Sequence, residues 1–168
     1  DGAVQPREGR EPLPAGFETR PATPENGMQI LRAYDEAMRD SREYGGMPDE
    51  ALAIMLERQQ AMLPHWVVAW HDDEVVAGVL GWVDEAENKA RDRRRGYVER
   101  IFTRRPWRRQ GIAGALICQD LRNLRDRGMR EGAMAFDADN PSGAGSLYTS
   151  LGFHRHNGFA TYRRTVPT

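Results

Sequence analysis

Hydrophobic and polar residues alternate in ways that divide the first half of the chain into short elements. Residues 17–23 alternate like an edge strand, and apolar residues then recur at helical spacing over 28–38 and over 52–62. Residues 66–70 and 75–83 are apolar, rich in valine and tryptophan, and separated by a short polar segment, a pattern typical of a hairpin. The first half is therefore predicted to form a strand, two helices and a hairpin.

The second half of the chain adds a strand-helix-strand unit. The predicted elements are a surface loop over 84–95, a strand over 97–103, a helix with its apolar stripe over 113–124, a strand over 131–137, a helix over 142–151 and a strand pair over 153–163. A strand-helix-strand order implies a parallel crossover, whereas hairpins imply antiparallel pairs. We therefore predict a mixed sheet in an α/β or α+β fold.

The length and the composition of the first residues indicate one domain. The chain has 168 residues, close to the commonest domain size. Residues 1–16 are rich in proline and glycine and poor in apolar side chains, so we predict a flexible linker there and a single domain over 17–168. This linker and the absence of an initial methionine lead us to expect a further folded domain upstream.

Charge and cysteine content limit the partners. Lys and Arg number 24 against 25 Asp and Glu, for a net charge of -1, which does not favour a nucleic-acid partner. Nine arginines lie between Arg91 and Arg109, and we interpret them as cofactor contacts mixed with solvated surface. Cys118 is the only cysteine, so we expect a reducing, cytoplasmic location. The apolar stretch 75–83 is about half of what a bilayer crossing needs, so no membrane partner is expected.

The segment 104–114 has the composition of an anion-binding turn. It lies between a predicted strand and a predicted helix, where free backbone N–H groups and the positive end of the helix dipole face outward. Gly111, Ala113 and Gly114 would let a phosphate approach the backbone, and Arg108 and Arg109 would add charge. The segment matches neither the nucleotide-hydrolysing nor the dinucleotide-binding glycine motif, so a pyrophosphate bound without Mg²⁺ is implied.

Two motifs resemble those of a known superfamily. The residues R-R-Q-G-I-A, 108–113, resemble the R/Q-x-x-G-x-G/A acyl-CoA motif of the GCN5-related N-acetyltransferases, or GNAT proteins. The residues N-P-S-G-A, 140–144, followed by L-Y-T-S-L-G-F, 147–153, are similar to the closing motif of that superfamily. The residues in and around both motifs are also similar to those of the C-terminal catalytic halves of tandem, mycothiol-synthase-like acetyltransferases. The resemblance implies a mixed, splayed sheet of about six or seven strands flanked by about four helices.

The same resemblance implies direct transfer of an acetyl group from acetyl-CoA to a primary amine of a small molecule or peptide. The residues then expected to bind the cofactor are Ile101, Phe102, Thr103, Arg108, Arg109, Gln110, Gly111, Ile112, Ala113, Gly114 and Asn140. Tyr148 is our candidate acid for the leaving thiolate, since a tyrosine with an ordinary pKa of about 10 is protonated at neutral pH. Glu99, which would share a strand face with Ile101 while Arg100 points the other way, is our candidate base.

Other interpretations of these residues stay open. Tyr148 could be a core aromatic and Glu99 a solvent-facing carboxylate, and the domain could sense acetyl-CoA without turnover. His154 and His156 lack a third ligand nearby in sequence, so we predict no metal. Trp82 is assigned to a substrate pocket whose walls would come from the early helices, 44–47 and 82–88. No charge pattern there names the amine, and a homodimer is left open.

Overall fold

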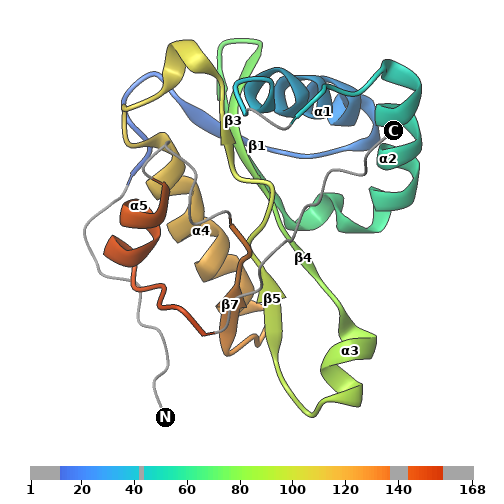
Figure 1. The fold of residues 1–168 in the computed structure, drawn as a ribbon, viewed down its shortest axis with the longest axis vertical. Helices are drawn as coiled ribbons and strands as arrows, with labels where there is room; N and C mark the ends of the chain where they lie inside the picture. The colour runs from blue at the N-terminus through green and yellow to red at the C-terminus, as the bar shows by residue number, and fades with distance from the viewer. Residues whose placement is uncertain (1–11, 42–43, 137–143, 157–168) are drawn as a thin grey trace, which may run out of the picture.

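The computed structural model describes residues 12–41, 44–136 and 144–156, and Figure 1 traces the chain. Its strands are β1 (Glu18–Pro21), β2 (Trp66–His71), β3 (Glu74–Leu80), β4 (Trp82–Val83), β5 (Arg95–Tyr97), β6 (Phe102–Thr103) and β7 (Glu131–Ala133). Its helices are α1 (Pro24–Met38), α2 (Asp49–Gln59), α3 (Glu85–Ala90), α4 (Ile112–Asp126) and α5 (Ala144–Ser150), with 3₁₀ turns η1 (Gln60–His65) and η2 (Arg105–Trp107).

Helices cover both faces of the larger sheet, whose strand order is β1-β2-β3-β6 with antiparallel neighbours throughout. The side chains of β2 alternate between these faces. Trp66, Val68 and Trp70 join the apolar cluster of α1 and α2, whereas Val67 and Ala69 join the cluster of α4 and α5. Figure 1 shows the two pairs of helices on opposite sides of the strands. One strand therefore contributes to two hydrophobic cores.

The smaller sheet has the strand order β4-β5-β7 and contains the crossover. β4 and β5 are antiparallel, whereas β5 and β7 are parallel and are joined in sequence through β6 and α4. The two sheets diverge between β6 and β5, which are consecutive along the chain. The mixed, splayed sheet flanked by helices that the sequence predicts is confirmed.

The predicted strand over 97–103 is instead two short strands, β5 and β6, with a break at 98–101. Arg100 has a φ of 46°, in the left-handed region, which costs a non-glycine residue roughly 1–2 kcal/mol. Within the break, the Leu80 N–H donates to the Glu99 carbonyl at 3.0 Å; after it, Phe102 pairs with Gly78 in the larger sheet. The prediction of one continuous strand is therefore wrong at the point where the sheet divides.

The predicted surface loop over 84–95 contains a helical turn, α3. The Asp84 carboxylate caps it by accepting the Glu87 N–H at 2.7 Å. Asn88 is buried and closes the segment, because its side-chain amide donates to the Arg95 carbonyl at 2.8 Å and accepts the Arg95 N–H at 3.0 Å. Figure 1 shows α3 at the far end of an arm formed with β4 and β5. Local capping gives order to a segment whose polarity predicted none.

Glycines let α4 pack close against the smaller sheet. A Cβ placed on Gly96 would lie 2.3 Å from Cδ2 of Leu124, and one on Gly132 would lie 2.6 Å from Cδ2 of Leu121. Real Cβ atoms do not approach other carbons so closely, so both leucines occupy space that only glycine leaves free. The C-terminal half of α4 is thereby seated on β5 and β7.

Two predicted segments lie near the ends of the chain, the linker over 1–16 and the strand pair over 153–163. Leu13, within the predicted linker 1–16, packs against the cluster that contains α4. The predicted strand pair over 153–163 lies mostly outside the described residues. No helix within the described ranges is long and apolar enough to cross a membrane.

Candidate functional site

The turn between η2 and α4 leads to backbone N–H groups that have no hydrogen-bond partner among the described residues. Arg109 and Gly111 both have left-handed φ values, 64° and 83°, and both are exposed. α4 begins at Ile112 without a side-chain cap, and within the described ranges no acceptor is found for the N–H groups of Ile112, Ala113 and Gly114. The space beside Gly111 is open, since a Cβ built there would meet no atom within 4 Å. This arrangement is that of an anion site at a helix N-terminus.

Arg108 has a different position from the one that its sequence motif suggests. Its guanidinium lies against the end of α1, where it donates to the Ala37 carbonyl at 3.1 Å and contacts Asp40 at 2.6 Å. Its Nε also donates to the Thr103 carbonyl at 2.9 Å. Arg108 therefore fixes the turn to β6 and α1, and Arg109 is the arginine of this pair whose side chain is exposed. A phosphate contact by either arginine stays a prediction.

An aromatic cluster supports the other side of the turn. Trp107, in η2, packs on His71 with ring centroids 4.7 Å apart, and Phe17 meets Trp107 edge-on at 5.5 Å. These contacts join the turn to the β2–β3 hairpin and to the segment before β1. The backbone that would face a ligand is therefore supported from both sides.

The break at 98–101, between β5 and β6, provides a second set of N–H groups. In the described part of the chain, no hydrogen-bond acceptor is found for the N–H groups of Glu99, Arg100 and Ile101. Phe102 is buried and pairs with Gly78, and Thr103 pairs with Ala77, so both predicted cofactor residues belong to the larger sheet. Ile101 is half-buried and packs against the core that contains α4. N–H groups without partners in the middle of a sheet are suited to stabilising a developing negative charge.

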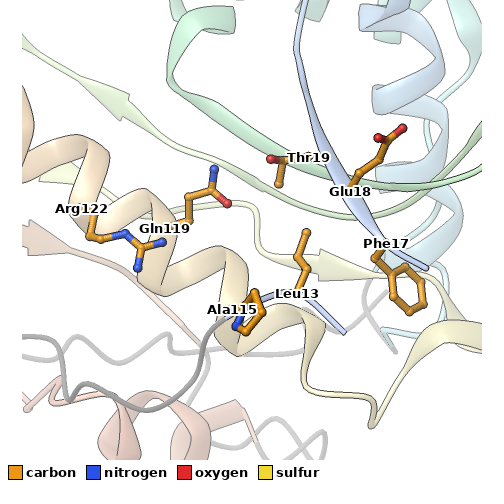
Figure 2. Close-up of a pocket in the computed structure, with 8 residues that line it drawn as sticks. Leu13, Phe17, Glu18, Thr19, Ala115, Gln119 and Arg122 are labelled. Atoms are coloured by element: carbon orange, nitrogen blue, oxygen red, sulfur yellow. The ribbon is translucent and has the colours of Figure 1, made fainter. Parts of the chain in front are cut away.

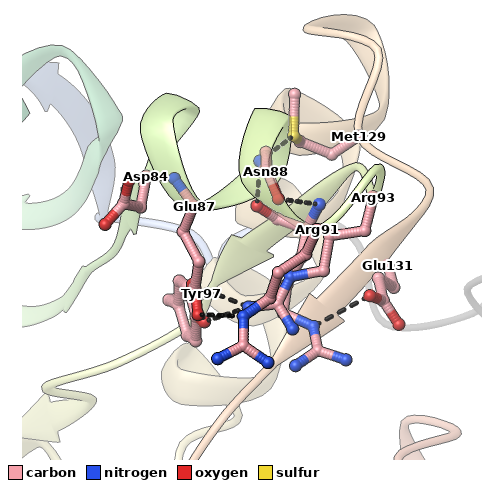
Figure 3. Close-up of polar contacts among 9 residues, drawn as sticks. Asp84, Glu87, Asn88, Arg91, Arg93, Tyr97, Met129 and Glu131 are labelled. Carbon is pink, nitrogen blue, oxygen red and sulfur yellow. Dashed lines mark hydrogen bonds and ion pairs between the residues drawn. The ribbon is translucent and has the colours of Figure 1, made fainter.

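The Glu99 side chain is half-buried and lies beside Trp82, whose indole N–H makes a long hydrogen bond of 3.5 Å to Oε2 of Glu99. The Trp82 ring stacks on Tyr97 with centroids 4.1 Å apart and an interplanar angle of 11°. Figure 3 shows how Tyr97 is held in turn: its hydroxyl donates to Glu87 at 2.7 Å and accepts from Arg93 at 2.9 Å. Glu99 thus lies beside the stacked rings of Trp82 and Tyr97. The substrate pocket assigned to Trp82 stays a prediction.

A buried carboxylate orders the connection between α1 and α2. Asp35 is 4% exposed and accepts hydrogen bonds from the Tyr44 hydroxyl at 2.8 Å and the Met47 N–H at 2.7 Å. Arg39 forms an ion pair with the same carboxylate at 2.7 Å. Burial by itself would raise the pKa of Asp35, but these hydrogen bonds outweigh burial and hold the pKa below its ordinary value. The predicted wall over 44–47 is therefore tied to α1.

Tyr148 lies on the α4 side of the sheet, in α5. It is 9% exposed and belongs to the cluster that contains Ile112, the first residue of α4. Its ring meets Phe136 edge-on with centroids 5.2 Å apart. Burial raises the pKa of Tyr148, so its hydroxyl stays protonated at neutral pH. Tyr148 therefore belongs to the core that contains α4, whereas Glu99 lies beside Trp82.

Some predicted features have no counterpart that can be placed. Asn140 lies outside the described residues. Among the residues that the structure describes, no group of three His, Cys, Asp or Glu side chains could hold a metal ion.

A cavity of about 290 Å³ lies between the segment before β1 and α4, as Figure 2 shows. It is lined by Leu13, Phe17, Gln119 and Arg122 among others, and none of the predicted site residues is among its lining residues.

Sequence reasoning missed Arg100 and Asp35. Strand alternation predicts Arg100 on the opposite face from Glu99, but its left-handed backbone interrupts the alternation on which that expectation depends. Asp35 shares its helix with apolar residues at the predicted spacing, and the only local signal is an arginine four residues later. The charges of Arg100, Asp35 and Glu99 all act on the pKa of the Tyr34 hydroxyl, which burial raises most.

Comparison with solved structures shows the same fold in acetyltransferases. A GCN5-related N-acetyltransferase from Sphaerobacter thermophilus is 25% identical, with a TM-score of 0.69 over 89% of this chain and 45% of its own. An aminoglycoside acetyltransferase, meta-AAC0020, from an uncultured soil metagenomic sample is 18% identical, with a TM-score of 0.66 over 93% of this chain and 100% of its own. This chain therefore spans less than half the length of the Sphaerobacter protein.

Comparison of the sequence with curated proteins finds no significant match. Residues 29–153, in contrast, match the acetyltransferase (GNAT) family. The matched region runs from α1 to the end of the L-Y-T-S-L-G-F motif and includes the turn before α4, the broken strand and Tyr148. By this match and by its fold, the chain belongs to the GNAT family of acetyltransferases.

Proposed function

We propose that this chain is an acetyl-CoA-dependent N-acetyltransferase that transfers the acetyl group directly to a primary amine of a small molecule or peptide. One observation carries this proposal. Two sets of backbone N–H groups lack partners in the described chain, one at 99–101 before β6 and one at 112–114 at the start of α4, and Glu99 of the first set also supplies a carboxylate. One set suits a phosphate and the other an oxyanion, which are the two negative charges that the reaction must accommodate.

The turn before α4 fits the pyrophosphate of acetyl-CoA. Gly111, Ala113 and Gly114 are small enough for close approach of a phosphate, and the exposed Arg109 adds a positive charge next to the N–H groups. The space beside Gly111 is open. Acetyl-CoA would supply the activated thioester, and Ile101, Phe102 and Thr103 would line its path with backbone atoms. Asn140 keeps its predicted cofactor role.

Three groups of the chain would carry the proton and charge transfers. The Glu99 carboxylate, directly or through a water, takes the proton from the acceptor ammonium, so that the free amine can attack the thioester carbon. An N–H group at the break, on Arg100 or Ile101, donates a hydrogen bond to the oxyanion that forms. The Tyr148 hydroxyl then donates its proton to the leaving thiolate. The raised pKa of Tyr148 supports this role, since the hydroxyl is protonated at neutral pH.

The test follows free-thiol release from acetyl-CoA with a panel of acceptors. Because the structurally similar meta-AAC0020 has been crystallised in complex with sisomicin, the panel includes an aminoglycoside beside amino acids, simple amines and peptide N-termini. We expect thiol release that depends on the acceptor. Stabilisation by acetyl-CoA without thiol release from any acceptor would contradict catalysis and would indicate a sensor domain instead.

A matched pair of variants tests the phosphate turn. Gly111→Asp and Gly111→Asn introduce side chains of nearly the same shape, and both residue types tolerate a left-handed backbone better than other residues do. Asp adds a negative charge where the phosphate would bind, so Gly111→Asp should abolish the rise in melting temperature caused by acetyl-CoA, while Gly111→Asn keeps most of it. Equal stabilisation of both variants by acetyl-CoA would show that the turn is misassigned.

A further inference from the structure

Arg100 is a half-buried cation in the break between β5 and β6. In the described part of the chain, no carboxylate lies within ion-pair distance of its guanidinium. Five other half-buried arginines differ in this respect. Each of the following has a carboxylate oxygen between 2.6 and 3.1 Å away: Arg20, Arg93, Arg95, Arg104 and Arg108. Because a partly desolvated guanidinium is costly without an anion, this position is suited to an anionic group of a ligand.

The nearby carboxylates do not take this role. Asp35 is already occupied by Arg39, by the Tyr44 hydroxyl and by the Met47 N–H. Glu99 precedes Arg100 directly in the chain, yet its carboxylate contacts the Trp82 indole, at 3.5 Å. Two adjacent side chains of opposite charge are therefore held in the same region without pairing with each other.

The charges of Glu99 and Arg100 act on one common group, the Tyr34 hydroxyl of α1. Burial raises the pKa of Tyr34, Arg100 lowers it, and Asp35 and Glu99 raise it. A regular strand would have put Glu99 and Arg100 on opposite faces. The left-handed backbone of Arg100, with its φ of 46°, removes that constraint. A positive and a negative group thus follow one another at the break, and the negative one contacts Trp82 of the stacked Trp82–Tyr97 pair.

We propose that Arg100 binds the carboxylate of the acceptor while Glu99 faces its ammonium group, so that the acceptor is a free α-amino acid. This inference rests on the proposed function and narrows its acceptor. A planar guanidinium matches a carboxylate with two parallel hydrogen bonds. The stacked rings of Trp82 and Tyr97 offer an apolar surface to the side chain of the amino acid.

The test compares amines that differ only in the carboxylate. Phenylalanine is paired with phenethylamine, and lysine with 1,5-diaminopentane, and kcat/KM is measured by thiol release from acetyl-CoA. We expect the parent protein to prefer the amino acid of at least one pair by about tenfold or more, since a charge-assisted bidentate contact is among the stronger polar interactions. Equal or better turnover of both decarboxylated amines would overturn the inference.

Substitution of Arg100 assigns this preference to its side chain. Arg100→Asn and Arg100→Gly both tolerate a left-handed backbone, so either variant should fold, with a melting temperature no lower than that of the parent. We expect each to lose the tenfold preference, because kcat/KM for the amino acid should fall about tenfold further than kcat/KM for the matched amine, mainly through a higher KM. Arg100→Lys should keep part of the preference, since it keeps the charge without the planar fork.

Arg125→Asn is the matched control, because Arg125 is an exposed arginine near the C-terminal end of α4. It should retain the full preference. If Arg100→Asn kept the preference, or lost activity equally toward both members of a pair, the inference would be wrong. Failure of the proposed function looks different: no amine of any kind would be acetylated, although acetyl-CoA still raised the melting temperature.

Discussion

Asp120 should make the protein less stable as the pH rises toward neutrality. This carboxyl group lies in α4, is 1% exposed, and faces Gly81, where the chain leaves the larger sheet for the smaller one. Its Oδ2 has no hydrogen-bond partner within the described residues. Burial raises the pKa of Asp120 from 3.8 to about 7, and the positive charge of Arg127 offsets only part of that effect. The folded protein therefore holds this proton more tightly than the unfolded chain does.

The sign and size of the effect follow from this difference in pKa. The contribution of Asp120 to stability is fully present below the unfolded pKa of 3.8 and is lost as the pH rises through the folded pKa of about 7. A difference of about three units corresponds to about 4 kcal/mol at about 1.4 kcal/mol per unit. Between pH 5 and pH 8 the same two pKa values give a loss of about 2.5 kcal/mol.

Urea denaturation at pH 5 and at pH 8 measures this loss. Asp120→Asn removes the titrating group, so the free energy of unfolding of this variant, relative to the parent, should rise by about 2.5 kcal/mol between the two pH values. Any constant cost of the new amide cancels in that comparison. Asp126→Asn, which removes an exposed carboxylate of the same helix, should change with pH in parallel with the parent. If Asp120→Asn also ran parallel to the parent, the carboxyl would have to be ionised and satisfied in the folded protein, and the reasoning would be refuted.

Two further predictions concern the proposed acid, Tyr148, and the buried carboxylate of Asp35. Tyr148→Phe keeps the packing against Phe136 and removes only the hydroxyl, so kcat should fall by about 10²- to 10⁴-fold with stabilisation by acetyl-CoA unchanged; an unchanged kcat in the thiol-release assay would exclude the acid role. Asp35→Ala leaves the Tyr44 hydroxyl and the Met47 N–H without their acceptor, so it should lower the free energy of unfolding by about 3 kcal/mol at pH 7. That loss should shrink as the pH falls through the lowered pKa of Asp35, and a pH-independent loss in urea denaturation would contradict the hydrogen-bond account.

Much of the site could be predicted because its signals are local. The glycine at 111, followed by small residues and an apolar stripe, specifies a turn and a helix start within a few positions, and the structure has both. The two tryptophan- and valine-rich runs predict the hairpin for the same reason, since the runs and the short polar segment between them lie within a few consecutive residues. The capping signal of α3 is also local: Asp84 and Glu87 have the spacing of a capping box, and the polarity of the segment conceals it.

The remaining features depend on contacts between distant residues. The ion pair of Arg108 with Asp40 joins residues 68 positions apart, and no periodicity indicates that this arginine turns toward α1. Arg100 adopts a left-handed φ although arginine gives no sign of that preference. The hydrogen bonds on either side, from Leu80 to Glu99 and between β6 and β3, hold it there. Tertiary structure therefore decides which side of the break each charge occupies.

The seat of α4 on two glycines has a mechanical consequence for the far end of the helix. α4 has 15 residues, which makes it about 22 Å long. Leu121 and Leu124 rest where Gly96 and Gly132 have no side chains, while the opposite end begins at Gly111. A methyl group added at Gly96 would have to displace Leu124 or lift this end of the helix. Because a helix tilts as a rod, a lift at one end swings the other through a similar distance, so the alignment of the turn depends on two residues that lie nowhere near it.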